Sequence, residues 1–266
     1  MSQTTSAPYG RKWFDWSVLR LKRLLVFGLF TLCVIIAFSF WVIRQPGAGS
    51  AAAPPAPPRA GAKLVALSSG MTTAVNVTRS PEARWLTRTA AQTGIPARAL
   101  RAYVSAAVLA NDAAPACGIG WNTVAAVGFV ESAHGTYGGG SLNSAGQASG
   151  PIVGPSLNGV GFAAIGDTDA GALDGDPRWD HAVGPMQFIP ATWQLAGRDA
   201  NGDGRADPFN IDDAALSAAT YLCGSSRDLT TAQGWSDAIY AYNQSGPYIR
   251  QVRSQATAYA EKARTP

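Results

Sequence analysis

Glutamate, histidine and cysteine are all scarce in this chain. Among its 266 residues there are two His and three Cys, and the Glu residues are Glu82, Glu131 and Glu261. The two histidines, His134 and His181, have no third ligand at the spacing of a zinc motif, so a zinc site is not predicted. Patterns typical of β-strands are also scarce, which favours a mainly α domain.

A basic surface on the folded part of the chain is lacking as well. The formal net charge is +4, but residues 1–23 account for all of it, and the sequence from Pro46 onward holds 15 basic and 16 acidic residues. A nucleic-acid-binding domain normally carries its basic excess on the folded part. The charge pattern therefore argues against a nucleic-acid partner.

One long apolar run interrupts the N-terminal region. Residues 24–43 carry no charged side chain and end beside Trp41. Twenty helical residues extend about 30 Å, which matches the hydrocarbon core of a bilayer. The basic residues lie mostly before the run, so the positive-inside rule predicts a cytoplasmic tail (1–23), a single transmembrane helix (24–43) and an exported remainder in the cytoplasmic membrane. The alternative is a cleaved signal peptide with a small-residue cleavage site at 51–53.

The segment that follows is a predicted linker and stalk, residues 44–80. Its first part is rich in Pro, Ala and Gly and lacks apolar periodicity, which favours an extended spacer. Residues 81–266 then form the predicted folded domain. Cys33 lies in the predicted span, so Cys117 and Cys223 are the two cysteines in an exported, disulfide-permitting compartment. We predict that they pair; two independently buried thiols are the alternative.

Helix signals recur through the folded domain. Pro at a first helical position, Asn or Ser caps and Gly just past the last turn delimit the segments. They predict helices over 81–93, 96–111, 122–134, 190–196, 211–222, 235–242 and 248–263, with Asn122 capping the third and Gly135 ending it. Residues 138–180 interrupt this pattern with a long irregular insertion that we interpret as a cleft wall or lid with short β pieces. The acidic groups 167–169 and 174–176 inside it are predicted to make turns or line the cleft rim.

Glu131 lies at the end of the third predicted helix. At helical spacing it shares a face with Val124 and Val127, so its carboxyl is predicted to face the packed side. Its place at the negative end of the helix dipole and its desolvation both favour the protonated form. A carboxyl held protonated near neutral pH is what a general acid requires. The alternative is a terminal-turn glutamate that faces solvent.

Two later stretches offer amide, hydroxyl and aromatic groups suited to a sugar polymer. They are Gly-Pro-Met-Gln-Phe at 184–188 and Ala-Tyr-Asn at 241–243. With Glu-Ser at 131–132 ahead of them, this ordered trio resembles the lytic transglycosylases of the lysozyme-like superfamily, most closely the membrane-bound lytic murein transglycosylase B type in its actinobacterial form. The likeness runs over about residues 81–259 and implies a lysozyme-like helical domain. It implies that Glu131 is the sole catalytic acid/base and that the cleft is lined by Ser132, Met186, Gln187, Phe188, Tyr242 and Asn243.

The resemblance implies a reaction on peptidoglycan glycan strands without an organic cofactor. Ordinary glycosidases pair two carboxylates across the scissile bond, whereas Glu131 alone would serve here, with formation of a 1,6-anhydro ring. A muramidase that uses water is one alternative. A non-catalytic, calcium-dependent wall-binding module is another. Cell-wall synthesis or division proteins are the expected protein partners.

Residues 199–207 match the start of an EF-hand calcium loop. Asp199, Asn201 and Asp203 occupy positions 1, 3 and 5, Gly204 occupies position 6, and Arg205 would supply a backbone carbonyl at position 7. Asn210 stands where the loop needs its bidentate Glu. The resemblance implies a lengthened loop closed by Asp213, with Asp212 as the fallback, and a structural Ca²⁺. A turn capped by its own side chains is the alternative.

Overall fold

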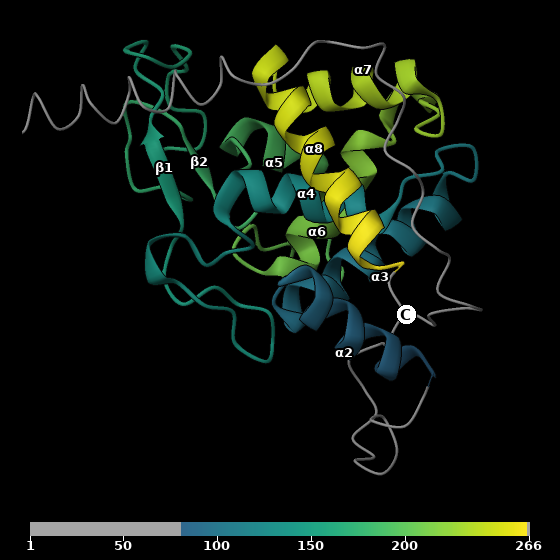
Figure 1. The fold of residues 1–266 in the computed structure, drawn as a ribbon. Coiled ribbons are helices and arrows are strands. Elements are labelled where there is room, and N and C mark those ends of the chain that lie inside the picture. Colours follow the sequence, from purple (N-terminus) through teal and green to yellow (C-terminus); the bar gives the residue numbers. More distant parts are fainter. Residues whose placement is uncertain (1–80, 265–266) are drawn as a thin grey trace, which may run out of the picture. The chain divides into compact units, whose positions relative to one another are not determined.

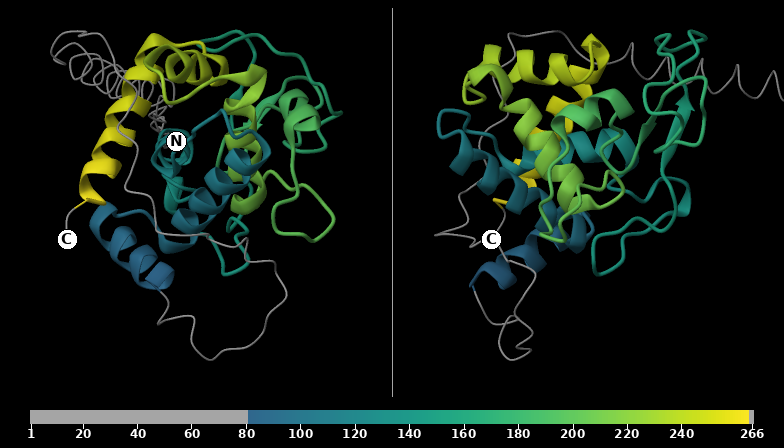
Figure 2. Two further views of the ribbon diagram at one scale, coloured as in Figure 1. Left: turned by 90° about the vertical axis from the view of Figure 1, so that its right-hand side faces the viewer. Right: turned by 180° about the vertical axis from the view of Figure 1, so that it is seen from behind.

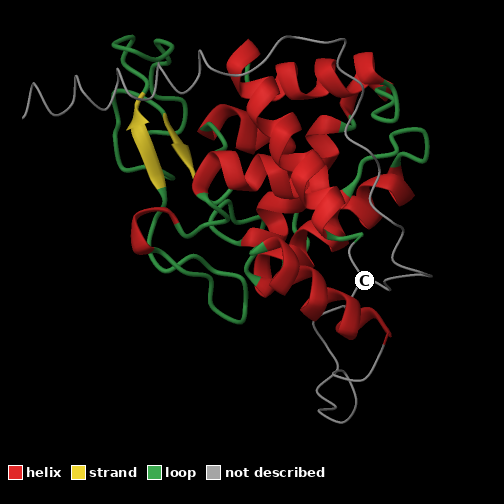
Figure 3. Ribbon diagram, viewed as in Figure 1, coloured by secondary structure: helices red, strands yellow, loops and turns green. Residues whose placement is uncertain are grey.

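The computed structural model describes residues 81–264 and is mainly helical in that range (Figures 1 and 3). Its α-helices are α2 (Pro81–Thr93), α3 (Ala97–Ala113), α4 (Trp121–Ser132), α5 (Pro190–Ala196), α6 (Ile211–Leu222), α7 (Ala232–Tyr242) and α8 (Gly246–Lys262). Two 3₁₀ turns, η2 (Tyr137–Gly139) and η3 (Gly224–Ser226), and two strands, β1 (Val153–Ser156) and β2 (His181–Val183), complete the elements. The predicted mainly α class is confirmed for these residues.

Helix α4 lies at the centre of the packing. It contacts α3 on one side and α8 on the other, and α8 crosses it in Figure 1. Its residues from Val124 to Val127 are all 0% exposed. Helix α3 also packs along α6, and α2 contacts the C-terminal part of the chain through α8 (Figure 2). The helix that carries Glu131 is therefore held on several sides.

Most helix boundaries follow the predicted signals. Helices α5 and α6 have the predicted bounds, and the Asn210 side chain caps α6 by accepting a hydrogen bond from the Asp212 amide. The start of α4 was predicted incorrectly. Gly120 is its N-cap, and Asn122 lies inside the first turn, where its side-chain amide donates to the Ala256 carbonyl. The buried α8 backbone competes for that amide, which explains the difference.

The end of α4 also differs from the prediction. The helix stops at Ser132, and Ala133 takes the left-handed conformation expected of Gly135. The Ala133 amide then donates to the Phe129 carbonyl and the His134 amide to the Gly128 carbonyl. Gly135 is left-handed too, at φ 80°, but it comes two residues later.

The disulfide prediction is confirmed. Cys117 and Cys223 are bonded, across a sequence separation of 106 residues. The bond joins the loop before α4 to the end of α6, and both cysteines are buried. Next to it, the Leu229 amide donates to the Cys117 carbonyl.

The insertion at 138–180 contains the predicted β structure. Strand β1 pairs antiparallel with β2, which lies just beyond the insertion, with Val153 opposite Val183 and Ser156 opposite His181. In Figure 3 this small sheet stands beside the helices. The pairing places residues 153–156 of the insertion beside residues 181–183, directly before the 184–188 turn.

The predicted cytoplasmic tail (1–23), transmembrane helix (24–43) and stalk (44–80) lie outside the described residues. Within residues 81–264, no helix is long and apolar enough to cross a membrane.

Candidate active site

Glu131 occupies the last turn of α4, one residue before the helix ends. Its side chain is half-buried, and the hydroxyl of Tyr248, near the start of α8, donates a hydrogen bond to Glu131 Oε1. Tyr248 is itself buried and sits three residues after Ser245, which caps α8. The contact between α4 and α8 thus brings a phenol to one carboxyl oxygen of Glu131.

The surroundings of Glu131 favour its protonated form. Burial raises the pKa of this carboxyl from 4.5 to about 7, and the Tyr248 hydrogen bond, which favours the ionised form, offsets part of that rise. No neighbouring carboxylate contributes to the shift. A lone carboxyl with a pKa near 7 can donate a proton and take one back at neutral pH.

Ser132 ties the end of α4 to the 184–188 turn. Its hydroxyl donates to the Pro185 carbonyl at 2.6 Å and accepts from the Gly135 amide at 2.8 Å. The side chain is buried, with both bonds made inside the protein. Ser132 therefore fixes the backbone next to Glu131 against the turn.

The 184–188 turn has an unusual backbone. Gly184 has a φ of 76°, and a side chain there would collide with the Pro208 carbonyl. Gln187 is left-handed at φ 50°, and its side-chain amide donates to the Gly184 carbonyl at 3.0 Å. Met186 and Phe188 are buried, so their side chains pack within the protein behind the turn. A non-glycine residue held left-handed is a conformation that recurs at functional sites.

Tyr242 connects that turn to α7. Its hydroxyl donates to the Met186 carbonyl at 2.7 Å, and its ring packs edge-on against Phe188. The pKa of Tyr242 is raised well above its ordinary value, first by burial and then by the charge of Glu131. Asn243 follows as the C-cap of α7 and is exposed. The turn, Tyr242 and Glu131 therefore lie close together in the fold.

Sequence reasoning missed Tyr248 as a partner of Glu131. It also missed a buried contact in which the His134 ring bridges the hydroxyls of Tyr103 and Tyr259. The Ser-Gly-Pro sequence at 245–247 is a signal for the start of a helix, and α8 begins there. Nothing in the spacing of these tyrosines showed which residue each hydroxyl would meet.

The predicted calcium loop lies between α5 and α6. Asp199 accepts from the Gly202 and Gly204 amides, and Asp203 accepts from the Arg205 amide. Asp213 is 0% exposed, and its carboxylate faces the loop, where it accepts from the Ala200, Asn201 and Asp207 amides. Asp212, the fallback ligand, instead pairs with Arg98. Carboxylate, amide and carbonyl oxygens are the donors that Ca²⁺ prefers, so the donor set fits that ion in its chemistry.

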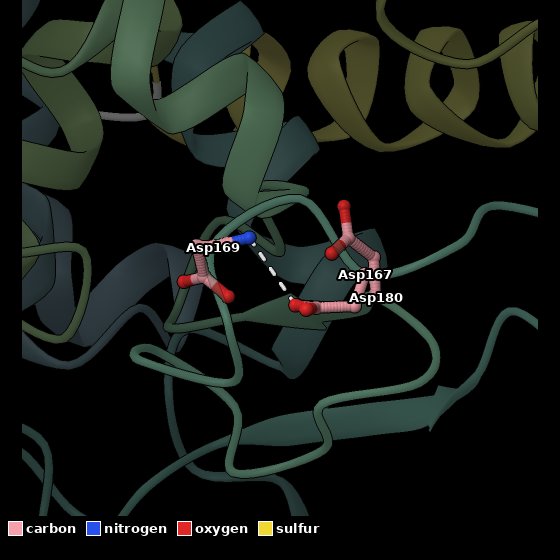
Figure 4. Close-up of side chains that lie close together, drawn as sticks. All are labelled: Asp167, Asp169 and Asp180. Carbon is pink, nitrogen blue, oxygen red and sulfur yellow. Dashed lines mark hydrogen bonds between the residues drawn. The ribbon is translucent and has the colours of Figure 1, made fainter.

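A second group of acidic residues lies within residues 138–180. Among residues 81–264, Asp167, Asp169 and Asp180 each place one carboxylate oxygen so that the three oxygens lie within 4.8 Å of one another (Figure 4). Each is already hydrogen-bonded: Asp167 to the Asp169 amide, Asp169 to the Leu173 amide, and Asp180 to the Thr168 amide and hydroxyl. These bonds agree with the predicted role in turns.

Comparison with known proteins bears on the second half of this site. No curated protein and no solved structure gives a significant match to the chain. Residues 163–257, which include the 184–188 turn, Tyr242 and Tyr248, match the family model described as the transglycosylase SLT domain. Glu131 lies before the matched segment and is brought to it by α4. The match supports lytic transglycosylase activity on peptidoglycan as the general activity of this domain.

Proposed function

We propose that the protein is a peptidoglycan lytic transglycosylase of the membrane-bound B type, in its actinobacterial form. It would cleave the β-1,4 bond between N-acetylmuramic acid and N-acetylglucosamine and leave a 1,6-anhydro end. The observation that carries the proposal is Glu131: a lone carboxyl with a pKa raised to about 7, beside a turn and a tyrosine that belong to a transglycosylase SLT match.

The proposed mechanism uses Glu131 twice. Protonated Glu131 gives its proton to the glycosidic oxygen, and the bond from that oxygen to C1 of the muramoyl residue breaks. The N-acetyl group of the same residue stabilises the positive charge that develops at C1. The Glu131 carboxylate then takes the proton of the C6 hydroxyl, whose oxygen bonds to C1. Glu131 ends protonated, and no water is consumed.

The Tyr248 hydroxyl has a defined task in this scheme. It donates to Oε1 of Glu131, which leaves Oε2 to carry the transferred proton. When Glu131 becomes a carboxylate, the same hydrogen bond stabilises the new charge. Tyr248 therefore moderates a pKa that burial alone would raise further.

Product analysis tests the proposal. Purified peptidoglycan is incubated with the full-length protein, with Glu131→Gln, and with Glu261→Gln as a control for loss of an exposed glutamate. We expect soluble fragments with 1,6-anhydro ends from the wild-type and the control, and none from Glu131→Gln. Fragments heavier by one water would indicate a muramidase, and binding without any release would indicate a wall-binding module.

We also propose that the 199–213 loop holds a structural Ca²⁺. Asp199, Asp203 and Asp213 would supply carboxylate oxygens, with the Asn201 amide oxygen and the Arg205 carbonyl. A bound ion would pin the loop between α5 and α6. Thermal unfolding tests this: calcium should raise the Tm of the wild-type protein and leave that of Asp203→Ala unchanged. An equal rise in both would contradict it.

The proposed location is the cytoplasmic membrane, with the catalytic domain on the wall side. Its support is the uncharged 24–43 run and the basic residues before it. Removal of residues 24–43 should release the protein from sedimented membranes. A protein equally soluble with and without the segment would contradict an uncleaved anchor.

A further inference from the structure

His134 is a buried titratable side chain that the proposed reaction does not use. It is 4% exposed, and its ring lies between two tyrosines from different helices. Nδ1 is 3.1 Å from the Tyr103 hydroxyl of α3, and Nε2 is 2.8 Å from the Tyr259 hydroxyl of α8. Both ring nitrogens are therefore hydrogen-bonded inside the core, three residues after Glu131.

The backbone at this point is strained. Ala133 and His134 are both left-handed, at φ 50° and 65°, and Gly135 follows at 80°. Two consecutive non-glycine residues in this region are unfavourable for L-amino acids. Such a conformation persists when the surrounding structure over-determines it. Here the hydrogen bonds from the His134 ring to α3 and α8 hold the backbone directly after the last turn of α4, which carries Glu131.

Helix α8 links this contact to the carboxyl. Tyr248 and Tyr259 are 11 residues apart, about three helical turns, so they leave α8 on nearly the same face. One hydroxyl meets Glu131 and the other meets His134. The end of α4 is thus bonded to α8 at two points, and Ser132 bonds it to the Pro185 carbonyl on the other side.

We propose that His134 is a positioning residue that, through Tyr103 and Tyr259, fixes the end of α4 and the register of α8 so that Glu131 meets Tyr248 and the cleft. The inference deepens the proposed function and rests on it for its kinetic readout. A neutral imidazole has one donor and one acceptor nitrogen, so one tyrosine donates to the ring and the other accepts from it. The two hydrogen bonds therefore run in one donor-to-acceptor order through the ring, and an apolar side chain at this position could make neither of them.

Burial keeps His134 neutral. It lowers the pKa of the imidazole from 6.5 to about 4. The pKa of Tyr259 is raised to about 12, also mainly by burial. Neither group changes its charge near neutral pH, so the network is a fixed support across the range in which Glu131 titrates.

The experiment compares full-length variants by kinetics and by NMR. Tyr259→Phe and His134→Leu remove bonds of the network, and His134→Gln keeps a neutral donor and acceptor. Val252→Ala is the matched control, because Val252 is fully buried in α8 between the two tyrosines and makes no polar contact. The readouts are kcat and KM for peptidoglycan, and the carboxyl ¹³C titration of Glu131, which Glu131→Gln assigns among the three glutamates.

We expect kcat to fall about 10- to 100-fold in Tyr259→Phe and His134→Leu, since small misplacements of a catalytic group cost that much. KM should change little, and His134→Gln should recover part of the loss. Because the two residues share one contact, the double variant Tyr259→Phe/His134→Leu should lose less than the sum of the two single losses. Because the Tyr248 hydrogen bond lowers the pKa of Glu131, loss of the register should move the Glu131 midpoint above about 7 in both single variants, and Val252→Ala should leave it in place.

Wild-type kcat and an unmoved Glu131 midpoint in folded Tyr259→Phe and His134→Leu would overturn the proposal. An equal loss in Val252→Ala would overturn it as well, because stability alone would then explain the effect. If the wild-type protein releases no fragments, the proposed function fails. The titration of Glu131 then decides the positioning role by itself.

Discussion

Replacing Glu131 with Gln should stabilise the folded protein at alkaline pH. Burial raises the pKa of the folded carboxyl from 4.5 to about 7. The folded state therefore binds this proton more tightly than the unfolded chain does. This tighter proton binding stabilises the folded protein fully below pH 4.5, and the stabilisation is lost as the pH rises through 7. Above that pH the wild-type protein must keep an anion in a site that disfavours it.

The size of the effect follows from the shift. One pKa unit corresponds to about 1.36 kcal/mol, so the rise is equivalent to about 3 kcal/mol. Glu131 is half-buried and retains some solvent contact, which reduces the expected gain to about 2–3 kcal/mol. Gln has nearly the same shape, carries no charge and can still accept the Tyr248 hydrogen bond. The substitution thus isolates the free-energy cost of holding the Glu131 carboxylate in its charged form in the folded protein.

Urea unfolding of the full-length protein, followed by tryptophan fluorescence, measures the gain. At about pH 8 the free energy of unfolding of Glu131→Gln should exceed that of the wild-type protein by this amount, and at about pH 4 the two should agree. Glu261→Gln, at an exposed position in α8, should follow the wild-type curve at both pH values. A difference between Glu131→Gln and wild-type that does not grow with pH would refute the assigned cause of the shift.

Three further predictions concern activity and the core. Turnover of peptidoglycan should decline as the pH rises through about 7. Tyr248→Phe should move this decline to higher pH, because the Tyr248 hydrogen bond lowers the pKa of Glu131. A decline at the same pH in Tyr248→Phe would argue against this role of Tyr248. Replacing Cys117 and Cys223 with Ser should lower the free energy of unfolding by about 4–5 kcal/mol if the lost constraint on the unfolded chain dominates, and urea curves of the oxidised wild-type and the double variant would measure it. Gly128→Ala would place a methyl group against the Tyr103 hydroxyl and should cost about 1–3 kcal/mol. Tyr103→Phe removes the atom in closest contact but also a buried hydrogen bond to His134, so the double variant should lose less than the sum of the two single losses; a loss equal to that sum would contradict the proposed clash.

The helices of this domain were predictable because their signals are local. Pro190 opens α5, Asn210 caps α6, and the apolar spacing of each segment sets its period. The disulfide followed from compartment and count. The ends of α4 were predicted incorrectly because tertiary contacts decide them: α8 takes the Asn122 amide, and the core takes His134.

The candidate site was predictable only in part, for a related reason. Glu131 and the 184–188 turn stand out in the sequence because of scarce residue types and special backbone positions. Tyr248, Tyr259 and Tyr103 do not, because a tyrosine in a helix is equally typical of core packing. Their roles depend on how α3, α4 and α8 cross, which no pattern along one helix determines. The same holds for Asp212 and Asp213, adjacent residues of which one pairs with Arg98 and the other faces the loop.

The site is assembled from two parts of the chain, and the boundary of the family match makes this clear. Residues 163–257 contain the turn, Tyr242 and Tyr248, but the carboxyl comes from α4, ahead of that segment. Bonds across the boundary hold it in place: Ser132 to Pro185, Glu131 to Tyr248 and His134 to Tyr259. The Cys117–Cys223 disulfide joins the same two parts covalently. The matched segment by itself therefore contains the turn and both tyrosines without the acid, and the raised pKa of Glu131 is a property of the docked parts together.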